Sequence, residues 1–233
     1  MDRPKGLSLL KPCPYNSDPE RGKKIIVRLR FQKKGTLRFI SHHDLMRLLE
    51  RALRRAELPI KMTQGFNPRL RMSFPLALAL GIEGHEEIVE LELSQWLSPK
   101  TLVEQLKAQL MEGLDIISAE VIAPSSSIVE EIVYQVQFHD PQAIAPEKIE
   151  GLLNLKEYWT SRERDGKKKA VNLRPSIRSV TQKDGCLEIR FKVLQEGTAR
   201  PEEVLEALGL EPPSHTNFKI ARVKVLLSPL AVA

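Results

Sequence analysis

The sequence predicts an α+β protein made of two ferredoxin-like units in tandem, each with the element order βαββαβ. Over residues 23–124, strand-like alternation and helix-like periodicity follow one another in that order. The order recurs less regularly over 125–233, after the linker-like stretch APSSS at 123–127. A length of 233 residues suits two small domains, and residues 1–22, which are proline-rich and aperiodic, predict an irregular N-terminal arm.

The first unit begins with the stretch KIIVRLRFQ at 24–32, whose apolar residues alternate with polar ones as in a half-buried strand. After the turn KKGT, the residues LRFI at 37–40 predict a short extended piece. A helix is expected to start at Ser41, because serine is a good N-cap and Asp44 stands three residues later, as in a capping box.

Two strands and a second helix complete this unit. RMSFPLALALGI at 71–82 and EEIVELEL at 86–93 predict the two strands of a hairpin. A helix follows between Ser98, with proline next to it at the first helical position, and Gly113. The stretch at 114–124 predicts the closing strand.

The second unit repeats this order with one addition. The segment 156–173, around an Asp-Gly turn, predicts a hairpin that does not belong to the simple order and decorates it. The other expected elements are a strand at 130–139, a helix at 145–155, a strand at 186–194, a helix at 200–210 and a strand at 218–227.

Charge is distributed unevenly along the chain. Residues 1–72 carry 18 Lys and Arg against 6 Asp and Glu, whereas residues 73–233 carry 18 against 24. A net charge of +6 therefore hides a strongly basic N-terminal third with a net charge of +12. Such asymmetry indicates a polyanionic partner, first a nucleic acid and second an anionic membrane surface. A solvated basic face without a partner is the alternative.

Several classes of protein do not fit the sequence. No apolar run approaches the length of about 20 residues that a membrane span needs, and the N-terminus resembles no signal peptide, so we expect a cytoplasmic protein without a membrane partner. The two cysteines, Cys13 and Cys186, have neither metal-type nor redox-type spacing. The sequence therefore predicts no bound metal or cofactor, and an iron–sulfur cluster or S-adenosylmethionine (SAM) is expected only in a partner protein.

Arginines gather on one face of the first predicted helix. Arg47, Arg51, Arg54 and Arg55 recur at helical spacing, and Glu50 is the acidic residue placed to pair with one of them. Guanidinium groups bind phosphates through a planar fork, so the stripe predicts an RNA-binding face. The full set of predicted RNA-binding residues is Arg28, Arg30, Lys33, Lys34, Arg47, Arg51, Arg54, Arg55, Arg69 and Arg71.

Two adjacent histidines, His42 and His43, stand at the start of the same helix. Adjacent helical residues point about 100° apart, which makes them poor partners in a metal site. Helix capping by Ser41 and Asp44 explains the cluster without chemistry. His42 nevertheless remains a candidate general acid or base acting on an RNA backbone.

The stretch LRFISHHDLMRLLERALRRAELPIKMTQGFNPRLRMSFPLALALGIEGHEEIVELEL, at 37–93, resembles the radical-SAM-linked proteins, a bacterial family of unassigned function. The similarity continues thinly through NLRPSIRSV and TARPEEVLEALGL. His43, where the family usually has leucine, and RLR at 69–71, where His-Pro-Lys is common, depart from the pattern. The residues matching the family motif are Ser41, His42, Asp44, Gln64, Gly65, Phe66, Asn67 and Pro68.

That resemblance implies a partner that is a radical SAM protein or a ribonuclease E/G-type protein. We therefore expect an RNA-binding accessory protein that presents tRNA or rRNA to such a partner and has no catalytic activity alone. One alternative is a metal-independent RNA-processing or RNA-modifying enzyme that uses His42. Another is a protein-docking module for a radical SAM partner.

Overall fold

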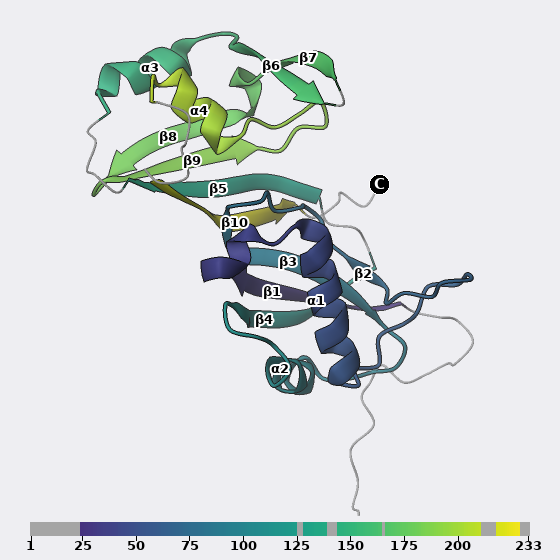
Figure 1. Ribbon diagram of the computed structural model, residues 1–233. Coiled ribbons are helices and arrows are strands. Elements are labelled where there is room, and N and C mark those ends of the chain that lie inside the picture. The colour runs from purple at the N-terminus through teal and green to yellow at the C-terminus, as the bar shows by residue number, and fades with distance from the viewer. Residues whose placement is uncertain (1–23, 125–127, 139–143, 165, 211–217, 229–233) are drawn as a thin grey trace, which may run out of the picture.

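The computed structural model describes residues 24–124, 128–138, 144–164, 166–210 and 218–228. The predicted arm at 1–22 and the middle of the predicted linker, 125–127, lie outside this part of the chain. The described residues form an α+β structure with four α-helices and one large mixed sheet, beside a small separate hairpin (Figure 1).

The large sheet has the strand order β4-β1-β3-β10-β5-β9-β8, and β2 pairs with β3. Neighbouring strands are antiparallel except β3 and β10, which run parallel through the pairs Ala221–Glu83 and Arg222–Gly84. The strands of the N-terminal half are β1 (Ile25–Lys33), β2 (Met72–Ser73), β3 (Glu83–Leu93) and β4 (Leu114–Ile122). Those of the C-terminal half are β5 (Ile128–Phe138), β8 (Ile177–Lys183), β9 (Cys186–Lys192) and β10 (Phe218–Ser228).

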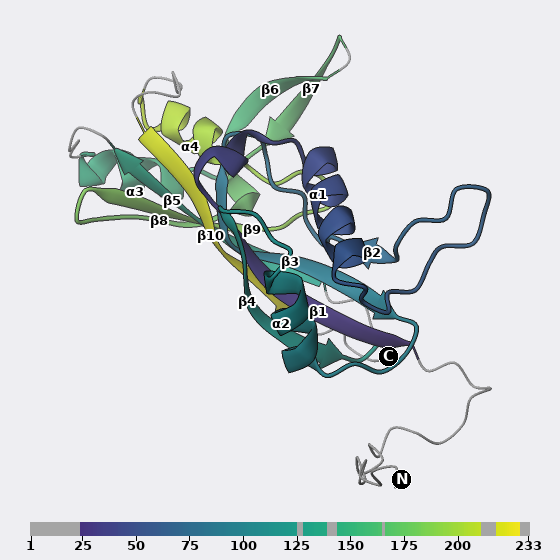
Figure 2. The same cartoon turned by 60° about the horizontal axis from the view of Figure 1, so that its bottom comes forward.

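Helices α1 (His42–Arg55) and α2 (Pro99–Lys107) cover one face of the N-terminal half (Figure 2). The alternation predicted for β1 explains this packing, because Val27, Leu29 and Phe31 are buried in one cluster with the leucines of both helices. Ser41 caps α1 as predicted, since its Oγ accepts a hydrogen bond of 3.1 Å from the backbone N–H of Asp44.

The C-terminal half has its own buried cluster, which β5, β8, β9 and β10 build together with α3 (Pro146–Asn154) and α4 (Pro201–Ala207). Leu78, Ile82 and Ile88, which precede the predicted domain boundary at 124, pack in this second cluster. The sheet also continues across that boundary, so the division into two domains stays a prediction.

The predicted hairpin at 156–173 is confirmed as β6 (Trp159–Arg164) and β7 (Lys167–Asn172), which form a separate two-stranded sheet. Figure 2 shows it projecting from the body of the protein. It therefore stands apart from the large sheet, as a decoration would.

Two predicted segments differ in the structure. The strand expected at 71–82 shrinks to Met72–Ser73, because Pro75 has no N–H for a sheet and Leu76, Leu78 and Ile82 beyond it pack as a loop against the second cluster. The short extended piece at 37–40 instead belongs largely to a 3₁₀ helix, η1 (Gly35–Phe39). In both segments apolar character by itself does not distinguish a strand from a loop or a 3₁₀ helix.

Candidate nucleic-acid interface

The arginine stripe on α1 is exposed to solvent. Arg47, Arg51, Arg54 and Arg55 are all exposed, while Leu45, Leu49 and Leu53 form the buried face of the helix. The structure therefore places the predicted cations and the buried leucines on different faces of α1, as their spacing requires.

Acidic neighbours neutralise this stripe only in part. Arg54 pairs with Glu50 at 2.9 Å, and Arg47 lies 3.5 Å from Asp44 in a pair exposed on both sides. Arg55 donates to the uncharged carbonyl of Gln109 at 2.9 Å, and Arg51 has no ion pair within the described residues. Exposed pairs of this kind are worth about 0–1 kcal/mol, so the helix keeps a positive surface that an incoming phosphate can use.

Two of the predicted RNA-binding cations are buried instead. Arg28 pairs with Glu90 at 2.7 Å on the sheet face away from α1, and only 1% of the surface of Lys33 is exposed. Burial lowers the pKa of Lys33 below its ordinary value, although nearby Glu87 opposes the shift. Neither residue is placed to meet a ligand at the surface.

Two further predicted cations are half-buried and already engaged. Arg30 lies 3.5 Å from Glu86 and donates to the carbonyl of Val225, and Arg71 pairs with Glu92 at 3.0 Å. Their charges are therefore largely satisfied within the sheet.

Lys34 and Arg69 have no ion pair within the described chain and remain available to a ligand. Arg38, which sequence reasoning missed, lies four residues after Lys34, and its guanidinium carbon is 4.6 Å from the ring centre of Phe39. The phenylalanine itself is 54% exposed, so this pair presents both a charge and a flat apolar face to solvent.

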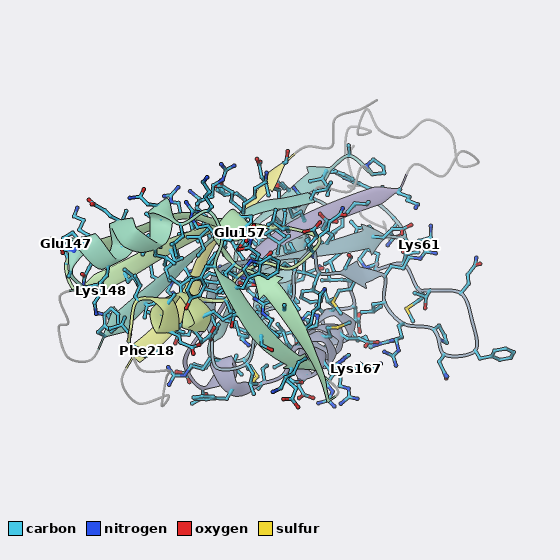
Figure 3. The ribbon with its side chains drawn as sticks, turned by 90° about the horizontal axis from the view of Figure 1, so that it is seen from above. Lys61, Glu147, Lys148, Glu157, Lys167 and Phe218 are labelled. Atoms are coloured by element: carbon cyan, nitrogen blue, oxygen red, sulfur yellow. The ribbon has the colours of Figure 1, made fainter. Side chains whose placement is uncertain are left out.

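Two projecting segments flank α1. The first is an arm over residues 60–71, whose two sides are joined by a β-bridge between Met62 and Leu70 and by a hydrogen bond from the backbone N–H of Arg71 to the carbonyl of Lys61. The second is the β6–β7 hairpin (Figures 2 and 3). At the tip of the first arm Phe66 is fully exposed, and Gly65 adopts a positive φ of 138°, which favours glycine. Arg69 belongs to the same arm.

The second arm carries three consecutive lysines, Lys167, Lys168 and Lys169, all exposed and without an ion pair within the described residues. Figure 3 shows this hairpin extending to a tip marked by Lys167. These consecutive lysines beside an Asp-Gly turn are visible in the sequence, but they lie outside the basic N-terminal third and are not among the predicted RNA-binding residues.

His42 occupies a partly apolar niche at the first residue of α1. Its ring meets that of Phe74 edge-on at 5.0 Å, and its Nδ1 atom is buried without a hydrogen-bond partner. Burial lowers the pKa of His42 below its ordinary value, and neighbouring His43 and Lys33 act in the same direction. The imidazole is therefore neutral at neutral pH and able to accept a proton.

The predicted family-motif residues fall into two separate places. Ser41, His42 and Asp44 belong to the capped start of α1, whereas Gln64, Gly65, Phe66, Asn67 and Pro68 are exposed on the arm that follows its other end. The motif thus does not converge on one catalytic centre. Among the described residues, no group of three or more His, Cys, Asp or Glu side chains is arranged to hold a metal ion.

Within the described residues, no helix combines the length and apolar character that crossing a membrane would take.

Comparison with known families gives one match. A family model described as "Uncharacterized protein conserved in bacteria (DUF2344)" matches residues 27–203, which include both arms and α1. The match carries no link to radical SAM proteins. No curated protein matches the chain.

Proposed function

The chain belongs to this family of uncharacterized proteins conserved in bacteria, and for this member we propose the function of an RNA-binding accessory protein. The observation that carries the proposal is the exposed, under-neutralised arginine face of α1, which stands between two projecting basic arms. The ligand we propose is structured RNA, with tRNA or rRNA first.

The chemistry of this surface supports RNA over other polyanions. Guanidinium forks match phosphate oxygens, and exposed aromatic faces such as Phe39 and Phe66 offer stacking platforms for unpaired bases. An anionic membrane would need apolar residues beside the cations of α1, but the exposed face of that helix is polar.

We also infer that each half of the sheet is a ferredoxin-like unit. The antiparallel order β4-β1-β3-β2 in the first half and the order β10-β5-β9-β8 in the second support this inference. Each follows from a βαββαβ chain in which the first and third strands are central, with the β6–β7 hairpin inserted in the second unit.

A filter-binding or fluorescence-anisotropy titration with total tRNA, repeated over a salt series, tests the proposal. The triple variant Arg47→Glu, Arg51→Glu and Arg54→Glu removes three proposed phosphate contacts. Since the logarithm of the binding constant falls with the logarithm of salt by about 0.7–0.9 per contact, the slope should flatten by about 2–3.

A matched control carries the same charge change on other elements, through Lys100→Glu in α2, Lys148→Glu in α3 and Lys183→Glu in β8, all at exposed positions. This control should bind tRNA nearly as wild type does. Absence of tRNA binding by the wild-type protein at low salt, or equal losses in both triple variants, would refute the proposal.

The identity of the protein partner rests on the family resemblance in the motif at 37–93. We propose that the RNA is presented to a radical SAM enzyme or a ribonuclease E/G-type protein. A pull-down with tagged chain, with and without nuclease, separates this from pure protein docking. Capture that survives nuclease and high salt favours direct docking, and capture that nuclease abolishes favours an RNA bridge.

The environment of His42 favours one second candidate, an RNA-processing or RNA-modifying enzyme. A neutral imidazole can act as a general base where a ring nitrogen comes within hydrogen-bond reach of the substrate. Purified protein would then alter RNA by itself, and His42→Ala would abolish the reaction while binding persists. Intact RNA after prolonged incubation would exclude this candidate.

A further inference from the structure

A basic hollow lies in the C-terminal half, on elements other than those of the α1 face. It has a volume of about 510 Å³, within the range of about 300–1,000 Å³ that is usual for small-ligand sites. Four cationic side chains line it from four separate stretches of the chain, and its lining is otherwise Leu155, Pro175 and Ile177. The cations are Lys156, Arg174, Arg178 and Lys192.

Arg174 is the fixed cation of this hollow. It belongs to the short 3₁₀ helix η2 (Arg174–Ser176), and its guanidinium donates to the carbonyls of Leu153, at 2.5 and 3.0 Å, and Ile177, at 2.7 Å. These acceptors hold the side chain in place but carry no charge. The positive charge of Arg174 is therefore positioned and not neutralised by an acid within the described residues.

A β-bulge directs Arg178 to the same place. The register of β8 against β9 shifts between Ile177 and Ser179, so Arg178 is the extra, unpaired residue of the bulge. Bulges commonly re-aim a side chain at the edge of a sheet. Here the guanidinium reaches Glu131 of β5 at 3.1 Å, and Glu131 stands directly opposite Lys192 in the β5–β9 ladder.

Glu131 is thus the one carboxylate that pairs with any of the four cations within the described residues. Lys156 and Lys192 are exposed and have no ion pair there. Four positive charges and one negative charge give the hollow a local charge of +3, so three of its positive charges have no acidic partner within the described residues.

We propose that this hollow binds a phosphate group of the RNA, as a second anchoring point beyond the α1 face. The proposal rests on the RNA-binding function proposed above and adds a place where the RNA backbone is held. A fixed guanidinium, a second one aimed by a bulge and two free ammonium groups are the donors that a phosphate prefers.

The position of the hollow suits that role. Lys156 directly precedes Glu157, which Figure 3 shows near the root of the β6–β7 hairpin, whereas Lys167 marks the tip. The hairpin therefore runs from the phosphate hollow at its base to a lysine cluster at its end. An RNA strand lying along it would meet positive charge at both ends.

The experiment uses the full chain and the double variant Lys156→Gln and Lys192→Gln, both at exposed positions where folding should be unaffected. The control is Lys148→Gln and Lys183→Gln, two exposed lysines of the same half. Calorimetric titration with inorganic pyrophosphate tests the hollow, and the tRNA salt series tests its use by RNA.

We expect pyrophosphate to bind wild type and control alike, and to bind the Lys156/Lys192 variant at least about tenfold more weakly. The same variant should flatten the tRNA salt slope by about 1, because one phosphate contact is lost. Equal pyrophosphate binding by all three proteins overturns the inference. An unchanged tRNA slope also overturns it and leaves the proposed function standing, whereas no tRNA binding by wild type overturns both.

Discussion

The replacement of Arg222 by methionine probes the contact that joins the two halves of the sheet. Only 1% of the surface of Arg222 is exposed. Its guanidinium donates two hydrogen bonds to the carboxylate of Glu87, one of them from Nε at 2.8 Å. It also donates to the backbone carbonyls of Ala77, at 3.1 Å, and Leu76, at 3.3 Å. Arg222 belongs to β10 and Glu87 to β3, which are the strands of the short parallel joint.

The loss of stability expected for Arg222→Met follows from the state of Glu87 in the variant. Glu87 is 3% exposed and would keep a buried carboxylate without its guanidinium partner. Removing one partner of a buried pair typically costs about 3–5 kcal/mol. Lys33, whose charge interacts with that of Glu87, compensates in part, so we expect a loss near the lower end, about 3 kcal/mol of the free energy of unfolding.

Urea denaturation followed by circular dichroism measures this loss. The double variant Arg222→Met and Glu87→Leu should recover most of the stability, because replacing both members of a buried pair by apolar residues is often nearly neutral. Arg54→Met, which breaks the exposed pair with Glu50, is the matched control and should cost less than about 1 kcal/mol. A loss below about 1 kcal/mol for Arg222→Met, or no recovery in the double variant, would refute the reasoning.

Two further predictions concern a glycine and a histidine. Gly113→Ala should lower the thermal unfolding midpoint well below that of Gly185→Ala. Both glycines have a positive φ, so both substitutions strain the backbone. A Cβ on Gly113 would also meet the carbonyl oxygen of Lys34 at 2.8 Å, whereas one on Gly185 would meet no atom within 4 Å. Equal midpoints by thermal denaturation would contradict that contact. Because burial lowers the pKa of His42 below 6.5, the unfolded state binds the proton more readily, so the free energy of unfolding should fall as pH drops below about 6.5. His42→Gln should reduce this fall in urea titrations at about pH 7.5 and 5.5, and an unchanged pH dependence would show that other groups cause it.

Local signals in the sequence were enough for several elements. The cap at Ser41, the apolar stripe of α1, the alternation in β1 and the Asp-Gly turn of the β6–β7 hairpin each depend on residues within about one or two turns of one another. The exposed arginine face of α1 followed from the same short-range spacing.

Sequence spacing was insufficient to predict the environment of a residue whose contacts are far away in the chain. In the apolar run at 71–82, Leu78 and Ile82 are buried in a loop against the second cluster, whereas Leu80 is 62% exposed. An apolar run alone cannot separate such a loop from a strand. Lys33 looked like a surface cation because nothing near it in the chain indicates that folding buries it beside Glu87.

Hydrophobic period and capping act over a few residues, so the sequence by itself was enough to predict the four helices, the uneven charge, the basic face of α1 and most strands of the large sheet, although β8 was not among them. Which cations remain free for a ligand depends on contacts between residues far apart in the chain. Arg28 meets Glu90 across 62 positions, and the basic hollow assembles Lys156, Arg174 and Lys192 from separate elements. The physical reason is that burial and neutralisation of a charge are properties of its neighbours in space, which folding brings together.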